Sequence, residues 1–236
     1  TAKGRVYAGE IFFNDLDIPH EIISRYSPST TVLSLTKLLD SVDNRNVDMH
    51  KGECGHTVII GGDIGYGGAA VMAGEAALRM GAGTITLASQ QAHLTACLSR
   101  QPELMFKAVA TGAELTTLLE SADTIVIGPG LGQSSWSKDM FSATLAFLAS
   151  HPVPAIFDAD ALNLLSKMPT LDHDWALDLE KIILTPHPGE AARLLEDSTQ
   201  NIQQDRLLGL ERMQKKWRCH VLLKGSGSLI SHPKGT

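Results

Sequence analysis

The chain has 236 residues and a formal net charge of −6 at pH 7, with acidic and basic residues mixed along its length. It has no basic block that could neutralise nucleic-acid phosphates and no apolar run near the roughly 20 residues that cross a bilayer, so we expect neither nucleic acid nor a membrane as a partner. Its cysteines, Cys54, Cys97 and Cys219, are odd in number and widely spaced, which favours reduced thiols and a cytoplasmic protein.

The first residues differ from the rest of the chain. Val6–Phe13 could form one strand, Arg25–Thr31 has the composition of a linker, and Ser34–Leu39 predicts a short helix. Beyond them, six short apolar runs predict strands, because strands that are covered on both faces carry continuous apolar residues. These runs are Thr57–Ile60, Thr84–Ala88, Thr124–Ile127, Ala155–Phe157, Lys181–Leu184 and His220–Leu223.

Helical patterns lie between these strands. They are Ala69–Met80, Ala113–Glu120, Lys138–Ala149, Ala161–Leu165, Glu190–Leu195 and Gln203–Trp217. Repeated alternation of strand and helix predicts an α/β fold with a mostly parallel central sheet and helices on both faces.

Two prolines flank His187 in the segment Thr185–Glu190, which follows a predicted strand and precedes a predicted helix. Proline fixes φ and removes an amide donor, so neither helix nor regular strand fits there and His187 should be displayed at the strand's end. Ligands of open α/β sheets bind beyond the carboxyl ends of the strands. We therefore expect His187 to be a site residue, although it could be a structural histidine and Glu190 could serve only the helix dipole.

Two glycine-rich loops, Gly61–Gly68 and Gly128–Gly132, also follow predicted strands. Glycines let backbone amides approach a ligand, and a helix begins directly behind the first loop. That loop contains Gly65-x-Gly67-x-x-Ala70, a relaxed dinucleotide fingerprint, but the acidic residue expected near the end of the next strand is missing. Close helix–sheet packing is the alternative for the first loop, whereas Gly128–Gly132 has more glycines than a turn requires and favours a ligand-facing role.

Further polar residues follow other strands. If the strand continues through them, Asp158 and Asp160 point to the same side and could hold a metal through water. Alternatively, Asp160 could cap the next helix. Lys224–Ser228 combines a lysine with small residues that can wrap a phosphate, although such a stretch can also be a generic turn. His50, Cys54 and His56 have no partner cluster, so we predict no metal site on protein ligands.

These loops, in this order and spacing, resemble the ADP/ATP-dependent NAD(P)H-hydrate dehydratases of the ribokinase-like superfamily. The resemblance covers roughly residues 50–230. The matching stretches are Lys51-Gly-x-x-Gly55, Val58-Ile-Ile-Gly-Gly62, Gly67-Gly-Ala69, Glu75-Ala-Ala-Leu-Arg-x-Gly-Ala-Gly83, Pro102-Glu103, Ile127-Gly-Pro-Gly-Leu-Gly132, Asp158-Ala-Asp-Ala-Leu-Asn163, Leu184-Thr-Pro-His-Pro-Gly-Glu190 and Leu223-Lys-Gly225.

The resemblance implies a hydro-lyase that uses ADP or ATP, with Mg²⁺, to dehydrate hydrated NADH or NADPH (NADHX or NADPHX) and restore the cofactor. Phosphorylation of the ring hydroxyl, followed by loss of phosphate, would explain why a dehydration consumes a nucleotide. We also expect a homo-oligomer. The residues that the resemblance implies are Ala69, Gly130, Gly132 and His187 for the dinucleotide, Lys224, Gly225, Ser226, Gly227 and Ser228 for the AMP portion of the nucleotide, and Asp158, Asp160, Asn163 and Glu190 as support.

Residues 1–32 are similar to the tail of an epimerase domain plus a linker, which would precede an incomplete dehydratase domain over residues 33–236. The family places a Gly-x-Gly-Asp motif, with the general-base aspartate, after the Lys-Gly loop. That motif is absent, so we expect this aspartate beyond Thr236 and no catalytic residue within the chain. Three alternatives stay open: a sugar or vitamin kinase of the same superfamily, a Rossmann-type NAD-dependent oxidoreductase, and a non-enzymatic binding module.

Overall fold

The computed structural model describes residues 7–12, 14–26, 30–40, 42, 46, 48–168 and 177–232. By its internal contacts the chain divides into one unit over residues 1–45 and a second from Asn46 to Pro233. Helices α2 (His20–Ile23) and α3 (Leu35–Asp40) belong to the first unit. The predicted short helix is thus confirmed as α3, although the sequence analysis counts it with the main domain. Among the described residues no helix is long and apolar enough to cross a membrane.

The strand expected over Val6–Phe13 is wrong where residues 7–12 are described, because none of them is in a strand. Tyr7, Ile11 and Phe12 are exposed, so this apolar stretch gains no buried face from a neighbouring strand. The predicted linker falls partly on residues 27–29, which lie outside the described residues.

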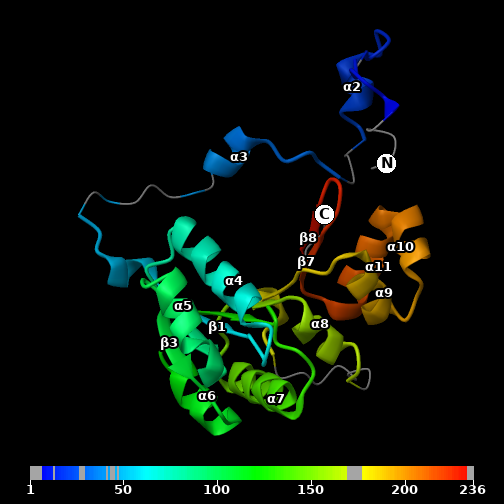
Figure 1. Ribbon diagram of the computed structural model, residues 1–236. Coiled ribbons are helices and arrows are strands. Elements are labelled where there is room, and N and C mark those ends of the chain that lie inside the picture. The colour runs from blue at the N-terminus through cyan, green and yellow to red at the C-terminus, as the bar shows by residue number, and fades with distance from the viewer. Residues whose placement is uncertain are drawn as a thin grey trace. The chain divides into compact units, whose positions relative to one another are not determined.

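The second unit contains an eight-stranded sheet in the order β3-β2-β1-β4-β5-β6-β7-β8. Figure 1 labels β3 and β8, the strands at its two edges. Strands β1 to β7 pair in parallel, and β8 runs antiparallel to β7. All six predicted strands are present, so the mostly parallel α/β sheet is confirmed. The strands are β1 (His56–Ile60), β2 (Thr84–Ser89), β3 (Met105–Ala108), β4 (Thr124–Ile127), β5 (Ala155–Phe157), β6 (Ile182–Leu184), β7 (His220–Leu223) and β8 (Leu229–Ser231).

The sequence analysis missed β3 and β8, the two strands at the edges of the sheet. In β3, Met105 and Lys107 are exposed, so the strand lacks the continuous apolar run that marks a covered strand. In β8, Ile230 is also exposed. Edge strands are buried on fewer sides, and their sequences therefore carry a weaker signal.

The predicted helices are also present, with one correction. Gln203–Trp217 is not one helix, because Asp205 leaves the helical conformation and its side chain accepts a hydrogen bond from the Leu208 amide at 3.0 Å, which caps a new helix. The helices and 3₁₀ turns of the second unit are η1 (Lys51–Cys54), α4 (Gly67–Arg79), η2 (Gln91–His93), α5 (Leu94–Arg100), α6 (Gly112–Leu119), α7 (Ser135–Ser150), α8 (Asp160–Leu165), η3 (Leu179–Lys181), α9 (Pro188–Leu195), α10 (Thr199–Gln204) and α11 (Arg206–Trp217).

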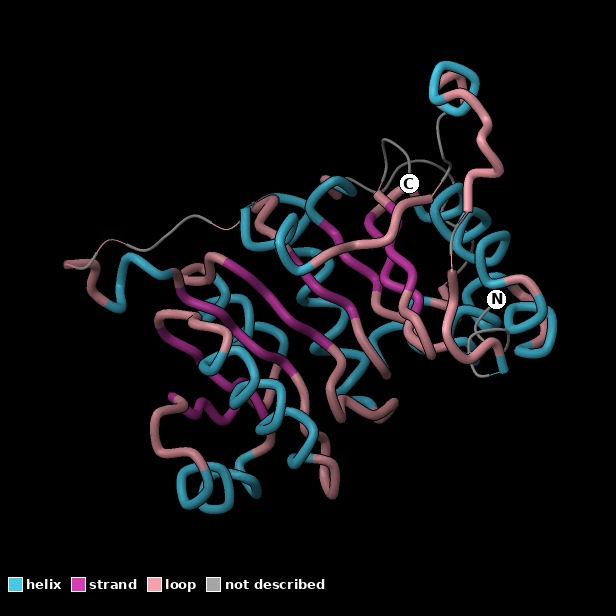
Figure 2. Tube along the Cα trace, turned by 90° about the horizontal axis from the view of Figure 1, so that it is seen from above, coloured by secondary structure: helices cyan, strands magenta, loops and turns pink. Residues whose placement is uncertain are grey.

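Helices cover both faces of the sheet (Figure 2). On one face α4 and α5 pack on β1 and β2 around Ile59, Ile85 and Leu87. On the other face the larger core joins α6 to α11 with β4, β5, β6 and β7, and Phe157 at its centre is fully buried. This is the arrangement that right-handed crossovers in a doubly wound sheet produce.

The strand register brings the loops of interest to one edge of the sheet. Ile60 pairs with Ile127, Ile127 with Phe157, and Phe157 with Leu184, so β1, β4, β5 and β6 end at one level. Leu184 pairs with Val221, and β7 extends two residues further. The five loops singled out in the sequence therefore all leave the carboxyl edge of the sheet.

Candidate functional site

The two glycine-rich loops are fastened to each other. The Gly62 amide donates to the Pro129 carbonyl at 3.1 Å, and the Asp63 amide donates to the Gly130 carbonyl at 2.8 Å. A Cβ on Gly130 would lie 2.3 Å from the Tyr66 carbonyl oxygen and 3.2 Å from the Ala69 Cβ. Two predicted dinucleotide residues, Ala69 and Gly130, are thus neighbours, and close packing between the loops by itself requires a glycine at 130.

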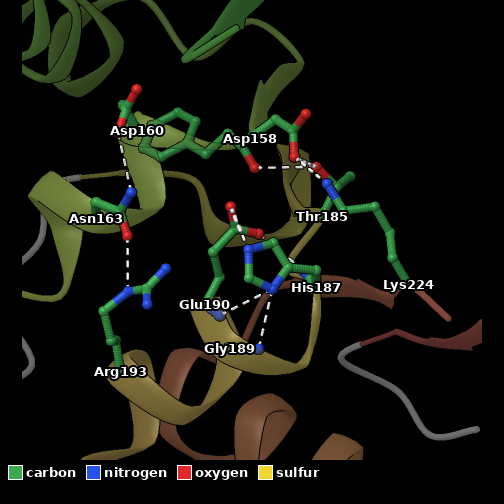
Figure 3. A network of polar contacts seen from close by, with 10 residues as sticks. Asp158, Asp160, Asn163, Thr185, His187, Gly189, Glu190, Arg193 and Lys224 are labelled. Carbon is green, nitrogen blue, oxygen red and sulfur yellow. Dashed lines mark hydrogen bonds and ion pairs between the residues drawn. The ribbon is translucent and has the colours of Figure 1, made fainter. Parts of the chain in front are cut away.

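A second chain of contacts runs from the Gly128–Gly132 loop to α9, and Figure 3 shows its part from Asp160 to Arg193. The Gly132 amide donates to Asp160 Oδ2 at 3.0 Å, and Asn163 Nδ2 donates to Asp160 Oδ1 at 3.0 Å. Arg193 Nε then donates to Asn163 Oδ1 at 2.8 Å. These contacts join the loop after β4 to two helices, so Gly132, Asp160 and Asn163 act as one structural group.

The expectation that Asp160 caps the following helix is wrong. Helix α8 begins at Asp160 itself, its N-cap position is Ala159, and no side chain caps it there. The Asp160 carboxylate is instead occupied by the Gly132 amide and the Asn163 side chain.

Asp158 lies at the meeting point of three strands. Its Oδ1 accepts hydrogen bonds from Thr185 Oγ1 at 2.8 Å and from Lys224 Nζ at 2.6 Å (Figure 3). The Lys224 amide donates to the Pro186 carbonyl at 2.8 Å. The loops after β5, β6 and β7 are therefore joined by one carboxylate and one lysine, and both hydrogen bonds end on Asp158 Oδ1.

His187 is displayed at the strand's end in an extended conformation, as expected, but its ring also caps α9. Nδ1 accepts from the Gly189 amide at 2.9 Å and more weakly from the Glu190 amide at 3.4 Å. In return Glu190 Oε2 accepts from the His187 amide at 2.8 Å, and Glu190 Oε1 lies 3.3 Å from His187 Nε2. This reciprocal pair is a capping box, so both structural roles that the sequence left open are present. The His187 side chain still exposes 50% of its surface, whereas that of Glu190 exposes 6%.

Backbone strain is concentrated between the two aspartates. Ala159 has φ 46° and ψ −118°, a region that residues with a Cβ rarely adopt. Gly128 has φ 125°, and a Cβ on it would lie 1.7 Å from the Asp158 carbonyl oxygen. The loops after β4 and β5 thus approach each other so closely that residue 128 has no room for a Cβ.

The Lys224–Ser228 loop presents exposed backbone. Lys224 is half-buried, and Gly225, Ser226, Gly227 and Ser228 are exposed. Arg206, the first residue of α11, lies behind this loop and donates to its carbonyl groups. Arg206 and Arg193 could not be predicted as site residues, because their partners are distant in the sequence and no local pattern marks them.

Two further features bear on ligands. In the part of the chain that the structure describes, no group of three or more His, Cys, Asp or Glu side chains could hold a metal ion. A cavity of about 490 Å³ lies between α10 and α11, lined among others by Asp197, Asn201, Leu208 and Arg212. None of the predicted site residues lines this cavity, so it is separate from the carboxyl edge of the sheet.

Comparison with known proteins gives the family. The sequence profile of the NAD(P)H-hydrate dehydratase family matches residues 57–236. The bifunctional NAD(P)H-hydrate repair enzyme of Coxiella burnetii is 40% identical over 98% of this chain, and that of Escherichia coli is 38% identical over 99%. The chain spans 45% and 43% of the length of these two relatives, that is, less than half of each.

Solved structures agree with this result. A ribokinase-like superfamily protein of Enterococcus faecalis is 31% identical, with a TM-score of 0.75 over 85% of this chain and 68% of that one. The ADP/ATP-dependent NAD(P)H-hydrate dehydratase of Bacillus subtilis, co-crystallised with ATP and Mg²⁺, is 26% identical, with a TM-score of 0.69 over 83% of this chain and 67% of that one. With its profile match, its relatives and its ribokinase-like fold, the chain belongs to the NAD(P)H-hydrate dehydratase family.

Proposed function

We propose that this chain carries an ADP-dependent dehydratase that restores NADH and NADPH from their hydrated forms. The observation that carries the proposal is the convergence of five loops at one sheet edge. There Lys224, in the loop proposed for the nucleotide, donates a hydrogen bond to Asp158 beside the loops proposed for the dinucleotide. Such an edge can hold two ligands next to each other, as transfer of a phosphoryl group between them requires. A protein of Listeria monocytogenes that is 35% identical over 65% of this chain is named an ADP-dependent (S)-NAD(P)H-hydrate dehydratase.

The hydrated dinucleotide is assigned to Ala69, Gly130, Gly132 and His187. The contact between Ala69 and Gly130 supports this, since it leaves a surface of small residues and backbone that a flat nucleotide can approach closely. The His187 side chain is half exposed, and its ring is held in orientation by the α9 amides at Nδ1 and by Glu190 Oε1 at 3.3 Å from Nε2, so its exposed surface suits a substrate contact. Asp160 holds the Gly132 amide, and Glu190 holds the His187 amide. Asn163 in turn bonds to Asp160, and Asp158 joins Thr185 to Lys224.

In the proposed reaction the hydroxyl of the hydrated ring attacks the β-phosphorus of ADP, and AMP leaves. Loss of inorganic phosphate, together with the ring proton next to it, then restores the double bond, so that hydrate plus ADP gives NAD(P)H, AMP and phosphate. Phosphate is a much better leaving group than hydroxide, which is why the nucleotide is consumed. We assign neither Asp158 nor Asp160 as general base, because Asp158 is paired with Lys224 and Asp160 is occupied by Gly132 and Asn163.

Mg²⁺ is proposed as a companion of the nucleotide. The described residues offer no cluster of three metal-ligating side chains, and Asp158 and Glu190 are already engaged by Lys224 and His187. They therefore do not form a protein cage for the ion. Mg²⁺ commonly binds through substrate phosphates and water with few carboxylates, and the phosphates of ADP would supply that chemistry.

The alternative activities differ in a testable way. The order β3-β2-β1-β4-β5-β6 is shared with Rossmann domains, but β2 ends in Ser89, whose hydroxyl donates to the Gly62 carbonyl at 2.9 Å, and no carboxylate follows to bind a ribose. Strand order alone does not settle function. A kinase of the same superfamily would leave a stable phosphorylated product, whereas a dehydratase releases free phosphate.

Three further assignments stay predictions. Residues 1–32 would be the tail of an epimerase domain, which is consistent with the bifunctional names of the relatives. A homo-oligomer would cover the edge strand β3, whose Met105 is 44% exposed, because open edges are usually covered. A cytoplasmic location agrees with three free cysteines, of which burial raises the pKa of Cys97 and raises that of Cys219 to about 12.

An isotope experiment tests the reaction. The full-length protein is incubated with ADP, Mg²⁺ and NADHX that carries ¹⁸O in the ring hydroxyl. We expect NADH absorbance to recover and the label to appear in inorganic phosphate, with AMP formed in equal amount. Label in water would exclude phosphorylation of the hydroxyl, and a stable labelled phosphate ester would favour a kinase. No NADH recovery with the full-length protein would overturn the proposed activity.

A further inference from the structure

Arg206 holds the backbone of the Lys224–Ser228 loop with a single guanidinium group. Its Nη1 donates to the carbonyls of Ser226 at 2.9 Å and Gly227 at 2.8 Å. Its Nη2 donates to the carbonyls of Leu223 at 3.1 Å and Lys224 at 3.4 Å. Four carbonyl oxygens therefore point toward one rigid cationic fork, which fixes the path of the whole loop.

This contact also decides where the amides of the loop point. In a planar trans peptide the N–H points opposite to the C=O of the preceding residue. The amides of Gly225, Gly227 and Ser228 must then face away from Arg206, on the exposed side of the loop. The Lys224 amide obeys the same rule, since it donates away from Arg206 to the Pro186 carbonyl at 2.8 Å. Several outward amides on one loop next to a lysine are donors that an anion can accept together.

The loop sequence fits the arginine. Gly225 has φ 156°, and a Cβ there would lie 2.8 Å from Arg206 Nη2, so a larger residue would push the fork away. Gly227 has φ 72° with nothing within 4 Å, so this glycine serves the conformation and not packing. Arg206 Nε is buried and has no hydrogen-bond partner among the described residues. The guanidinium is therefore oriented so that its two Nη groups bond to the loop carbonyls while Nε is left without a hydrogen bond.

We propose that Arg206 is a positioning residue for nucleotide binding, which turns the amides of Gly225, Gly227 and Ser228 outward to receive a phosphate group of ADP. This inference rests on the proposed function for the identity of the ligand. Arg206 itself lies behind the loop and acts through its backbone. Its removal should cost affinity for the nucleotide, because the loop would then have to be ordered on binding, while the dinucleotide side of the edge is untouched.

The test measures binding with two ligands and a matched control. Arg206→Lys keeps the charge but cannot reach four carbonyls, and Arg206→Gln removes the charge. Arg212→Gln is the control, because Arg212 lies on the same helix and pairs with Asp197 rather than with the loop. Calorimetric titration of the full-length proteins with ADP, and separately with NADPHX, gives both affinities, and a thermal melt reports folding.

We expect the Kd for ADP to rise about tenfold or more in Arg206→Gln and by less in Arg206→Lys, with the Kd for NADPHX within about twofold of wild type. Unchanged ADP affinity in a folded Arg206→Lys or Arg206→Gln protein would overturn the proposal. Equal weakening of both ligands with a lowered melting temperature would also overturn it, since that is general loss of structure. If Arg206→Gln does not fold, Arg206→Lys decides.

The ADP titration, combined with the dehydration assay described above, separates this proposal from the proposed function. A wild-type protein that binds ADP but does not dehydrate NADPHX would refute the dehydratase activity, and the variants would still judge Arg206 by their ADP affinity. A wild-type protein that binds no ADP would overturn both.

Discussion

Asp158 and Lys224 stand 66 residues apart in the chain, yet Lys224 Nζ lies 2.6 Å from Asp158 Oδ1. The contact joins the loop after β5 to the loop after β7, and Thr185 adds a hydrogen bond from the loop between them. In the proposed function it connects the dinucleotide side of the sheet edge to the nucleotide side. Both side chains are about one-third exposed, which limits what the pair adds to stability.

A double-mutant cycle tests this pair. We expect Asp158→Asn and Lys224→Met to show a coupling of about 0.5–1 kcal/mol in the free energy of unfolding, because solvent screens a partly exposed ion pair. Urea titration of the four proteins supplies the number. The pair Glu196–Lys216, at 2.9 Å but with Glu196 74% exposed, is the control and should couple less. Coupling at Asp158–Lys224 no larger than in this control would show that the contact does not hold the loops.

The sheet could be predicted from the sequence because its central strands are covered on both faces. β1, β4 and β5 carry runs of apolar residues that their burial explains. The edge strand β3 escaped prediction for the same physical reason, since Met105 and Lys107 face solvent. The break at Asp205 escaped because the helical pattern on its two sides is continuous, and only the capping geometry separates α10 from α11.

The candidate site was predictable only in part. Each loop was visible as glycine, aspartate or proline after an apolar run, and the parallel register brings such loops to one edge. The partners of these residues were not visible. Nothing local to Asp160 indicates that the Gly132 amide would occupy it, and nothing local to Arg206 points to a loop about twenty residues further along.

Ala159 offers a test of stored strain. Replacing Ala159 with glycine should raise the free energy of unfolding by about 1 kcal/mol, because glycine adopts φ 46° and ψ −118° without the cost that a Cβ imposes. Ala76→Gly on the exposed side of α4 is the control and should lower it by about 1 kcal/mol. Urea titration measures both, and a destabilised Ala159→Gly protein would argue against strain at this residue.

Gly128 should be the least replaceable glycine at the edge. In Gly128→Ala the new Cβ would meet the Asp158 carbonyl oxygen at 1.7 Å, and φ 125° is unfavourable for alanine. We expect a loss of more than about 3 kcal/mol, or failure to fold. Gly68→Ala is the matched control, because a Cβ there meets nothing within 4 Å and lies in a helix, so it should be neutral or stabilising. Soluble yield and thermal melts report the difference.

Asp197 predicts a pH dependence. Hydrogen bonds from Arg212, Asn201 and the Ser198 amide lower the pKa of its carboxyl from 3.8 to about 2. Because this pKa is lower in the folded state, the ionised carboxylate stabilises the fold at any pH above its ordinary pKa. This stabilisation is lost as the pH falls from about 4 toward about 2 and the carboxyl becomes protonated. The stability difference between wild type and Asp197→Asn should therefore be largest near neutral pH and shrink across that window. Urea midpoints at several pH values measure it, and a difference that is independent of pH would contradict the assignment.

His187 allows its two roles to be separated. His187→Asn retains an N-cap side chain that can accept the Gly189 amide, so it should keep the free energy of unfolding within about 0.5 kcal/mol, whereas His187→Ala should lose about 1 kcal/mol. Both variants lack the imidazole ring and should bind NADPHX about tenfold more weakly if the proposed contact exists. Ser198→Ala, which removes the cap of α10 that accepts from the Asn201 amide at 3.1 Å, should lose similar stability and keep dinucleotide affinity. If His187→Asn binds NADPHX as tightly as wild type, the ring makes no contact with the dinucleotide and His187 acts as a helix cap alone.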